Sequence, residues 1–329
     1  MPNDRIRAGV GMTGSGHGAG GKPLRPRDFI EDRQGWVYSV SAYDSAEKAG
    51  CVLRYVPDPS GDRLNPEGVR YRKVGFEESF RLAGEREPSY LEDVIRIPPE
   101  DIRVVYKPEE RLSFCIARDR RVGELAGLFS LPAGSLGCTG SRLLGIEGHS
   151  SDIDLVVYGR DFFRARDILR EAIGDGRVTD LSAEMWRIVY AKREPEIPFP
   201  VFLLHERRKW NRGEIGGTYF DLLYTRSYDD LTGAETRRGK QTGKKTIEAQ
   251  VTDATHAYDT PAVYLVEHRE VSRILSFTHT YSGQALEGEI VEACGVLEKH
   301  GAEVWLVVGT TRTARGEYII SKTLLEEEG

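Results

Sequence analysis

The chain has 329 residues, of which 39% are hydrophobic and 30% are charged, and its formal net charge is −6 at pH 7. This length favours two or three domains, and the net negative charge excludes a generally basic coat, so a polyanion would have to meet local basic patches. The N-terminus lacks a signal-peptide core, and no apolar run approaches the roughly 18 residues of a membrane span. We therefore expect a soluble, cytoplasmic protein with no membrane partner. The four cysteines stand far apart, which argues against a disulfide framework or a zinc site.

The N-terminal third divides into a leader and a β-rich module. Residues 1–26 are rich in Gly and have no hydrophobic period, which predicts a disordered leader. Residues 27–112 read mostly as short strands, with short helices over Phe76–Leu82 and Pro99–Arg103. This pattern predicts a small α+β module.

The aromatic residues of this module interleave with basic residues that include Arg54 and Lys73. Such interleaving is found on nucleic-acid-binding surfaces. Strands that alternate inward and outward residues produce the same pattern through core packing, so both interpretations stay open.

Residues 113–232 alternate between helix and strand patterns, which predicts an α/β domain with a mixed sheet. The predicted helices are Ala117–Phe129 and Asp161–Ile173. The predicted strands are Ser135–Thr139, Asp152–Tyr158, Arg187–Ala191, Pro200–Leu204 and Thr218–Tyr224.

Residues 233–329 contain evenly spaced strand patterns and almost no helix pattern. This spacing predicts a small, OB-like β-barrel, so the whole chain is expected to be a multidomain α+β protein. The loop histidine His279 lies among aromatic and polar residues, as in many nucleic-acid-binding barrels, although a histidine in a loop is more often structural.

Two carboxylates in the central domain share one face of a predicted strand. Asp152 and Asp154 are two residues apart, so they point the same way while Ile153 turns into the core. Two such carboxylates repel each other unless a cation lies between them. Mg²⁺, or Mn²⁺ in its place, prefers oxygen ligands of this kind, and we predict that both residues bind it.

A Gly-Ser pair precedes these carboxylates at the end of a predicted strand. Gly140 lets the backbone come close to a triphosphate, and Ser141 offers a hydroxyl to a phosphate oxygen. Arg142 follows, in a stretch that we expect to open a helix whose amides face the anion. We therefore predict nucleotide binding by Gly140, Ser141 and Arg142.

A third carboxylate is expected because two-metal phosphoryl transfer needs a base or a second-metal ligand near the attacking hydroxyl. Asp221 is the best candidate for this catalytic and metal-binding role, and Glu184 and Asp180 are weaker alternatives in polar, turn-like or helical surroundings. Asp221 is embedded in an apolar and aromatic strand, where an acid is costly unless it is paired or bound to metal. Just before this strand, the basic stretch His205–Gly213 carries Lys209 and Arg212. We predict that these two bind the nucleotide, with a solvated loop as the alternative.

The order of strand, Gly140-Ser141, Asp152-x-Asp154 and a later strand with Asp221 resembles the nucleotidyltransferase superfamily of DNA polymerase β. The resemblance implies that Gly140 and Ser141 are the phosphate-binding pair. It also implies that Asp152 and Asp154 hold the metals and that Asp221 is the third acid. The motifs cover about 100 residues. The domain order further resembles an uncharacterised archaeal group of that superfamily.

These patterns predict an enzyme that transfers a nucleoside monophosphate from an NTP to an acceptor hydroxyl, with RNA or DNA as the expected acceptor. A first alternative is a nucleic-acid-binding protein that retains the fold without turnover. A second alternative is an enzyme that nucleotidylates a protein or tRNA. The position of the Asp221 carboxylate discriminates between catalysis and binding alone.

Overall fold

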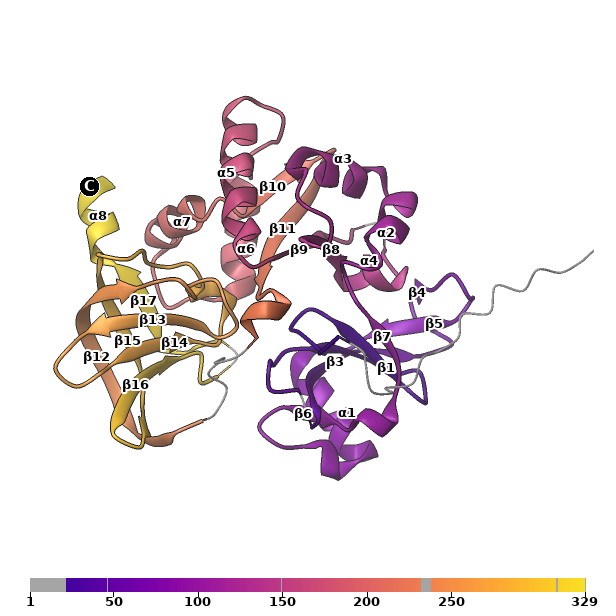
Figure 1. Cartoon of the computed structure of the whole chain (residues 1–329), viewed down its shortest axis with the longest axis horizontal. Coiled ribbons are helices and arrows are strands. Elements are labelled where there is room, and N and C mark those ends of the chain that lie inside the picture. Colours follow the sequence, from indigo (N-terminus) through magenta and orange to yellow (C-terminus); the bar gives the residue numbers. More distant parts are fainter. Residues whose placement is uncertain (1–21, 46, 149, 232–237, 312, 329) are drawn as a thin grey trace, which may run out of the picture.

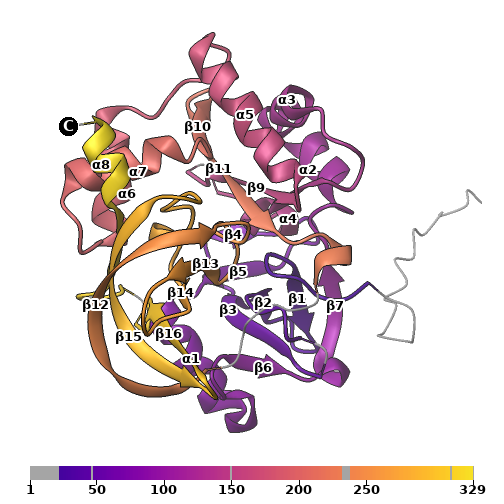
Figure 2. The same cartoon turned by 60° about the vertical axis from the view of Figure 1, so that its left-hand side comes forward.

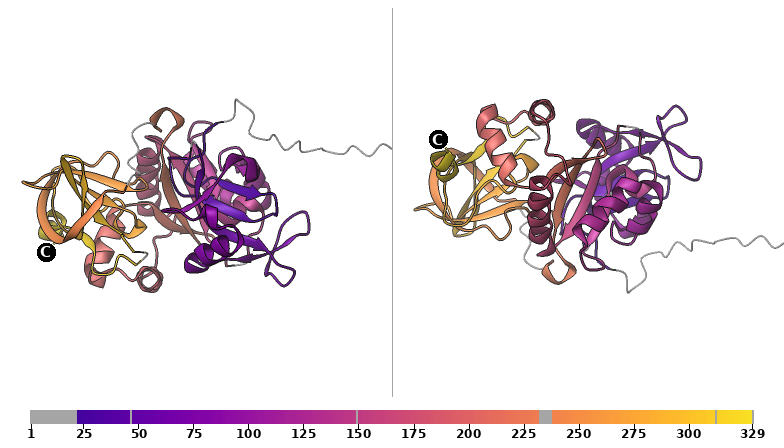
Figure 3. Two further views of the ribbon diagram at one scale, coloured as in Figure 1. Left: turned by 90° about the horizontal axis from the view of Figure 1, so that it is seen from below. Right: turned by 90° about the horizontal axis from the view of Figure 1, so that it is seen from above.

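The computed structural model of the chain describes residues 22–328 except 46, 149, 232–237 and 312, and it is a mixed α+β protein with three β-sheets. In the view of Figure 1 the central domain lies above the N-terminal sheet and the C-terminal sheet, and in Figure 3 these two sheets stand at opposite ends of the molecule. Within the described part of the chain, no helix has both the length and the apolar character that crossing a membrane requires.

The N-terminal sheet has seven antiparallel strands around a core of its own. These are β1 (Phe29–Asp32), β2 (Val37–Val40), β3 (Ala49–Pro57), β4 (Arg63–Leu64), β5 (Arg70–Lys73), β6 (Ile95–Ile97) and β7 (Ile102–Tyr106). Their order is β4-β5-β3-β2-β1-β7, with β6 also paired to β3. The helix predicted from Phe76 is confirmed as α1 (Phe76–Arg86). The helix predicted over Pro99–Arg103 is wrong beyond the single turn η2 (Pro99–Asp101), since the chain then continues as β7.

Residues 23–28, here called the N-terminal strap, run across the central sheet. The strap is held by side chains of two central strands, because Thr139 Oγ1 donates to the carbonyl of Arg27 at 2.7 Å and Thr225 Oγ1 to that of Pro26 at 3.2 Å. The predicted disordered leader lies outside the described residues up to position 21. Its last residues are ordered, however, and the leader prediction is wrong for them.

Arg25 in the strap explains this order. Its guanidinium lies between the rings of Tyr158 and Tyr228, with Cζ 3.8 and 3.6 Å from the two ring centres. Glu109 accepts hydrogen bonds from Arg25 and from both tyrosine hydroxyls, each at 2.8 Å. A buried arginine with this many partners fixes the segment that carries it.

The central domain is built on a four-stranded mixed sheet of order β10-β11-β9-β8, in which only β11 and β9 are parallel. The strands are β8 (Leu136–Thr139), β9 (Ile153–Tyr158), β10 (Arg212–Ile215) and β11 (Thr218–Thr225). The helices are α2 (Leu112–Arg118), α3 (Arg120–Phe129), α4 (Gly140–Leu144), α5 (Asp161–Gly174), α6 (Ala183–Arg193) and α7 (Phe199–Arg208). The mixed sheet and the helix near Asp161 agree with the sequence-based predictions.

Two predicted strands of this domain are helices instead. Strand Arg187–Ala191 lies in α6, which begins where Ser182 Oγ accepts a hydrogen bond from the backbone of Met185 at 3.1 Å. Strand Pro200–Leu204 lies in α7, whose buried residues Phe202, His205 and Glu206 have helical spacing. Both runs are short and rich in β-forming residues, which local patterns alone cannot distinguish from strands.

The single helix predicted over Ala117–Phe129 is two helices, α2 and α3. The chain breaks at Asp119, which is extended and caps α3 by accepting a hydrogen bond from Arg121 N. The carboxylate of Asp119 also forms an ion pair with Arg142. The break between the two helices therefore places Asp119 where it can hold Arg142, which lies in the segment before Asp152 and Asp154.

The C-terminal sheet has six strands and closes on itself, because β12 pairs with both β13 and β15 (Figure 2). The strands are β12 (Lys240–Asp253), β13 (Ala262–Glu267), β14 (Arg273–Ser276), β15 (Ile290–His300), β16 (Glu303–Val308) and β17 (Tyr318–Ser321), followed by α8 (Lys322–Glu328). Strands β14 and β16 are parallel and the other pairs are antiparallel. Most of the buried apolar residues of this ring form one continuous core with those of the central domain, and a small separate cluster surrounds Trp305.

Removing the Arg25 guanidinium should destabilise the folded chain. We expect Arg25→Ala to lower the free energy of unfolding by about 3 kcal/mol, because it leaves the buried Glu109 carboxylate without its cation. Lys22→Ala is the control, since the exposed Lys22–Glu110 pair at 3.4 Å is worth about 1 kcal/mol or less. Urea or thermal unfolding measures both variants, and equal stabilities would contradict the assigned role of Arg25.

Candidate active site

The three predicted carboxylates lie at one edge of the central sheet. Asp152 is exposed directly before β9, and Asp154 is partly exposed within it. In the strand pairing, Asp154 stands opposite Thr139 of β8 on one side and Asp221 of β11 on the other. Ile153, between the two β9 acids, is fully buried, as the predicted alternation requires.

Gly140 brings the backbone against the Asp154 carboxylate. It has a φ of +69°, and a Cβ at this position would lie 2.6 Å from Asp154 Oδ2. A glycine is therefore needed here for conformation and for space. Ser141 follows at the start of the five-residue helix α4. Among the described residues, its hydroxyl has no hydrogen-bond partner, so it is available to a ligand.

The three acids repel one another. The pKa of Asp154 is raised to about 6, first by burial and then by the charges of Asp221 and Asp152. Partial desolvation and the charge of Asp221 also raise the pKa of Asp152, while Lys192 and Lys73 oppose the shift. A cation bound at this edge would relieve both the desolvation and the repulsion.

Asp221 is held by an arginine. Arg212 Nε donates to Asp221 Oδ1 at 2.7 Å, and the same guanidinium pairs with the buried carboxylate of Glu206. Within the described residues, no three His, Cys, Asp or Glu side chains converge closely enough to hold a metal ion by themselves. One oxygen of the Asp221 carboxylate faces Arg212, and among the described residues Asp221 does not complete a three-acid cluster with Asp152 and Asp154.

Glu206 is the centre of a buried ionic cluster that includes Lys209 and Arg193 as well as Arg212. Burial alone would raise the pKa of Glu206, but these three cations hold it at about 2. The predicted nucleotide contact of Lys209 is wrong for this arrangement, because its side chain is only 1% exposed and donates to Glu206 and to the carbonyl of Thr280. Arg212 likewise positions Asp221 from a buried site, and the stretch around both residues is not a solvated loop.

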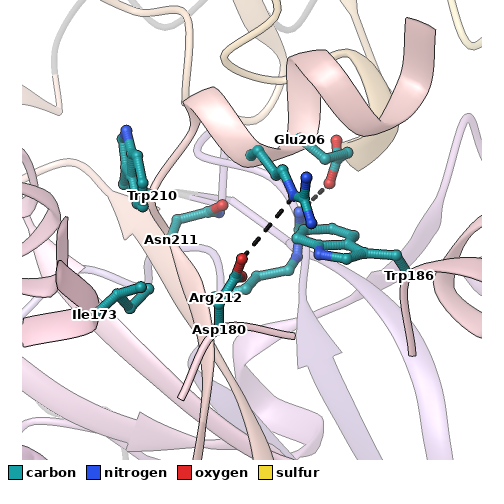
Figure 4. A pocket seen from close by; sticks show the side chains of 8 residues that line it. Ile173, Asp180, Trp186, Glu206, Trp210, Asn211 and Arg212 are labelled. Carbon is teal, nitrogen blue, oxygen red and sulfur yellow. Dashed lines mark hydrogen bonds and ion pairs between the residues drawn. The ribbon is translucent and has the colours of Figure 1, made fainter. Parts of the chain in front are cut away.

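A cavity of about 40 Å³ lies beside this cluster (Figure 4). Trp186 Nε1 and Asn211 Oδ1, from two residues that line it, are buried and have no hydrogen-bond partner among the described residues. One ordered water fits a cavity of this size and would supply both an acceptor and a donor. Because Arg212 and Glu206 also line this cavity, we interpret it as part of the buried surroundings that hold Arg212 in place.

Arg142 is also a positioning residue, which corrects its predicted role as a nucleotide contact. Its guanidinium is buried and donates to the backbone carbonyls of Ser151 and Asp152 and to the carboxylate of Asp119. These bonds fix the turn that enters β9. No donor of this side chain is directed to a ligand at the surface, because the residue is only 4% exposed.

Several cations near the acids come from outside the central strands. The charges of Arg27 and Arg54 lower the pKa of Asp154, and those of Lys192 and Lys73 lower the pKa of Asp152. Arg54 and Lys73 belong to the basic and aromatic pattern of the N-terminal module, so the sequence held a signal for them. It held none for Arg27, which reaches the site only because the strap crosses the sheet.

The chain is similar over most of its length to the uncharacterized protein MJ1086 of Methanocaldococcus jannaschii. The two share 34% identity over 334 residues, which cover 90% of this chain and 98% of that protein. No family model matches the chain, and no solved structure matches it. The name of the relative assigns no activity to it.

Adding a methyl group at position 140 should displace the Asp154 carboxylate. We expect Gly140→Ala to weaken Mn²⁺ binding at least about tenfold, as loss of supporting contacts does at metal sites. Gly217→Ala is a matched control, because its φ of +70° imposes the same backbone strain and nothing lies within 4 Å of the added Cβ. Calorimetric titration with Mn²⁺ and a non-hydrolysable NTP analogue compares the two, and equal affinities would contradict the proposed contact.

Proposed function

We propose that this chain, which belongs to the same family as MJ1086 of M. jannaschii, is a metal-dependent nucleotidyltransferase of the DNA polymerase β type. It would transfer a nucleoside monophosphate from an NTP to an acceptor hydroxyl and release pyrophosphate. The observation that carries this proposal is the register of β9 and β11, which sets Asp221 beside Asp154 at the edge where Gly140 follows β8.

Asp152 and Asp154 are the residues that would hold Mg²⁺ or Mn²⁺. Their raised pKa values and the absent Cβ of Gly140 fit a site shaped for a cation and a phosphate. Mg²⁺ is commonly held through one or two carboxylates with substrate phosphates and water, so a protein cage of three acids is not required. When bound, the metal would neutralise charge on the transferring phosphate and on the attacking oxygen.

The remaining residues would orient the substrates. Gly140 and Ser141 would hold the β- and γ-phosphates through backbone and hydroxyl contacts. Asp221 would accept a hydrogen bond from the acceptor hydroxyl and take its proton, with Arg212 Nε holding the carboxylate in place at 2.7 Å.

The acceptor that we propose is RNA or DNA. Support comes from the closed C-terminal ring, which we interpret as an OB-like barrel because β12 completes the circuit by pairing with β13 and β15. Further support comes from Arg54, Lys73 and Lys192, which make no ion pair with any described residue and lie near the acids. Phosphate groups of a nucleic acid are the natural partners of such cations.

The Arg212–Asp221 pair also favours a second candidate, a nucleic-acid-binding protein that retains the fold without turnover. One oxygen of the Asp221 carboxylate already accepts from Arg212 Nε, so it is less available to an acceptor hydroxyl. In that case the carboxylates would be dispensable and the ring and basic side chains would perform the function.

Nucleotide transfer tests the two candidates directly. The protein is incubated with each labelled NTP, Mg²⁺ or Mn²⁺, and pooled RNA, DNA and protein acceptors. We expect labelled nucleic acid, and at least a hundredfold less of it from Asp152→Ala/Asp154→Ala and from Asp221→Asn. Asp167→Ala, an exposed acid on α5, is the control. Label on protein would identify the acceptor as polypeptide, and no labelling with intact RNA or DNA binding would establish the second candidate.

Metal binding should depend on the protonation of Asp154. Its folded-state pKa of about 6 lies above the ordinary 3.8, so the stability that its protonated form contributes is present below pH 3.8 and lost as the pH rises through 6. The metal needs the deprotonated form, so its affinity should rise up to about tenfold per unit below pH 6 and level off above pH 7. Calorimetry with Mn²⁺ at several pH values measures this, and a flat profile would exclude Asp154 as a ligand.

A further inference from the structure

Arg27 is presented to the carboxylate edge by an unusual backbone. It has a φ of +80°, a left-handed conformation that few non-glycine residues adopt, and Thr139 fixes its carbonyl directly before Gly140. The Arg27 side chain lies near Asp154 and Asp221, whose charges act on it. It forms no ion pair with either of them, or with any other acid in the described part of the chain.

The Arg27 guanidinium meets a histidine from the C-terminal ring. Arg27 Nη2 lies 2.6 Å from Nε2 of His279, which begins the turn η4 (His279–Tyr281) between β14 and β15. Because a guanidinium only donates, this imidazole nitrogen must accept and the histidine must be neutral. Its Nδ1 then carries the proton and is a donor.

The Arg27 donors are not all satisfied. Nε of Arg27 is buried and has no hydrogen-bond partner among the described residues. The charges that act most strongly on His279 are those of four cations, namely Arg27, Arg193, Arg212 and Lys209, and Glu206 pairs with the last three. Arg27 is therefore the cation beside His279 that has no acidic partner among the described residues, and it faces the negative side formed by Asp152 and Asp154.

We propose that Arg27 and His279 bind the terminal phosphates of the NTP, so that the strap and the ring complete a nucleotide site begun by the central domain. This inference rests on the proposed function. With the metal on Asp152 and Asp154, the triphosphate would extend toward Arg27, whose Nε has no partner among the described residues and could form a fork with an Nη to one phosphate. His279 would add its Nδ1–H.

Phosphate binding is measured by calorimetry with two probes, tripolyphosphate without metal and a non-hydrolysable NTP analogue with Mg²⁺. We expect Arg27→Gln to lower the affinity for both probes about tenfold or more, which is the usual effect of losing a hydrogen bond to a charged group. Arg27→Lys should be intermediate because it keeps the charge and loses the fork. His279→Asn should also lower the affinity for both probes. In all of these variants, the affinity for the unphosphorylated nucleoside should not change. Arg269→Gln, which removes an exposed arginine of the same ring, should bind like the unmodified protein.

The outcomes separate this inference from the proposed function. If nucleotide transfer occurs but the Arg27 and His279 variants bind both probes normally and only melt earlier, the pair is a structural latch and the inference is wrong. If no transfer is found but tripolyphosphate binding depends on Arg27, the anion site stands and the proposed function falls. If Arg27→Gln fails to fold, the affinities of the more conservative variants His279→Asn and Arg27→Lys still test the inference.

Discussion

Repulsion among three carboxylates at one sheet edge is the constraint around which this molecule is arranged. The parallel pairing of β9 and β11 sets Asp154 beside Asp221, and Asp152 stands one step away. Like charges so placed resist folding unless positive charge or protons offset them. The chain supplies that charge from several directions, through Arg212 in β10, Arg27 in the strap and more distant cations of the N-terminal sheet and α6.

The buried ionic cluster around Glu206 holds Arg212, and through it Asp221, in place. Glu206 is buried on α7 and pairs with Arg193, Lys209 and Arg212, so each cation has a partner in a region where an unpaired charge would be very costly. Lys209 extends the cluster to the ring by donating to the carbonyl of Thr280, one residue from His279. The position of Asp221 is thus coupled to the packing of the ring against the central domain.

The contacts between the three parts have the same character. Tyr43 of the N-terminal module donates to Asp259 at 2.6 Å, and Arg226, after β11, donates to the other oxygen of the same buried carboxylate. With the strap crossing the central sheet and the ring sharing its core, the three parts form one unit. A site assembled from all three depends on that unit being intact.

Near the carboxylates, the sequence predicted the structure well. The strand containing Asp154, the turn at Gly140 and the strand containing Asp221 follow from alternation and glycine placement, which are local properties. The same reasoning was wrong for α6 and α7, where short β-branched and aromatic runs are compatible with either element and capping and helical packing decide. It was also wrong for Lys209 and Arg142, because a basic residue in a sequence carries no mark of the buried acid or carbonyl that it will contact.

By itself, the sequence determined the order of the segments, the strand faces and the three acids, because side-chain alternation and turn formation are set by neighbouring residues. Only the tertiary structure decided what stands around those acids. Arg27 and His279 are 252 positions apart and meet through the crossing of a strap and the closure of a ring. Whether an arginine lies on a solvated surface, holds a carboxylate in place or is available to bind a phosphate depends on such long-range contacts. Local sequence patterns do not encode them.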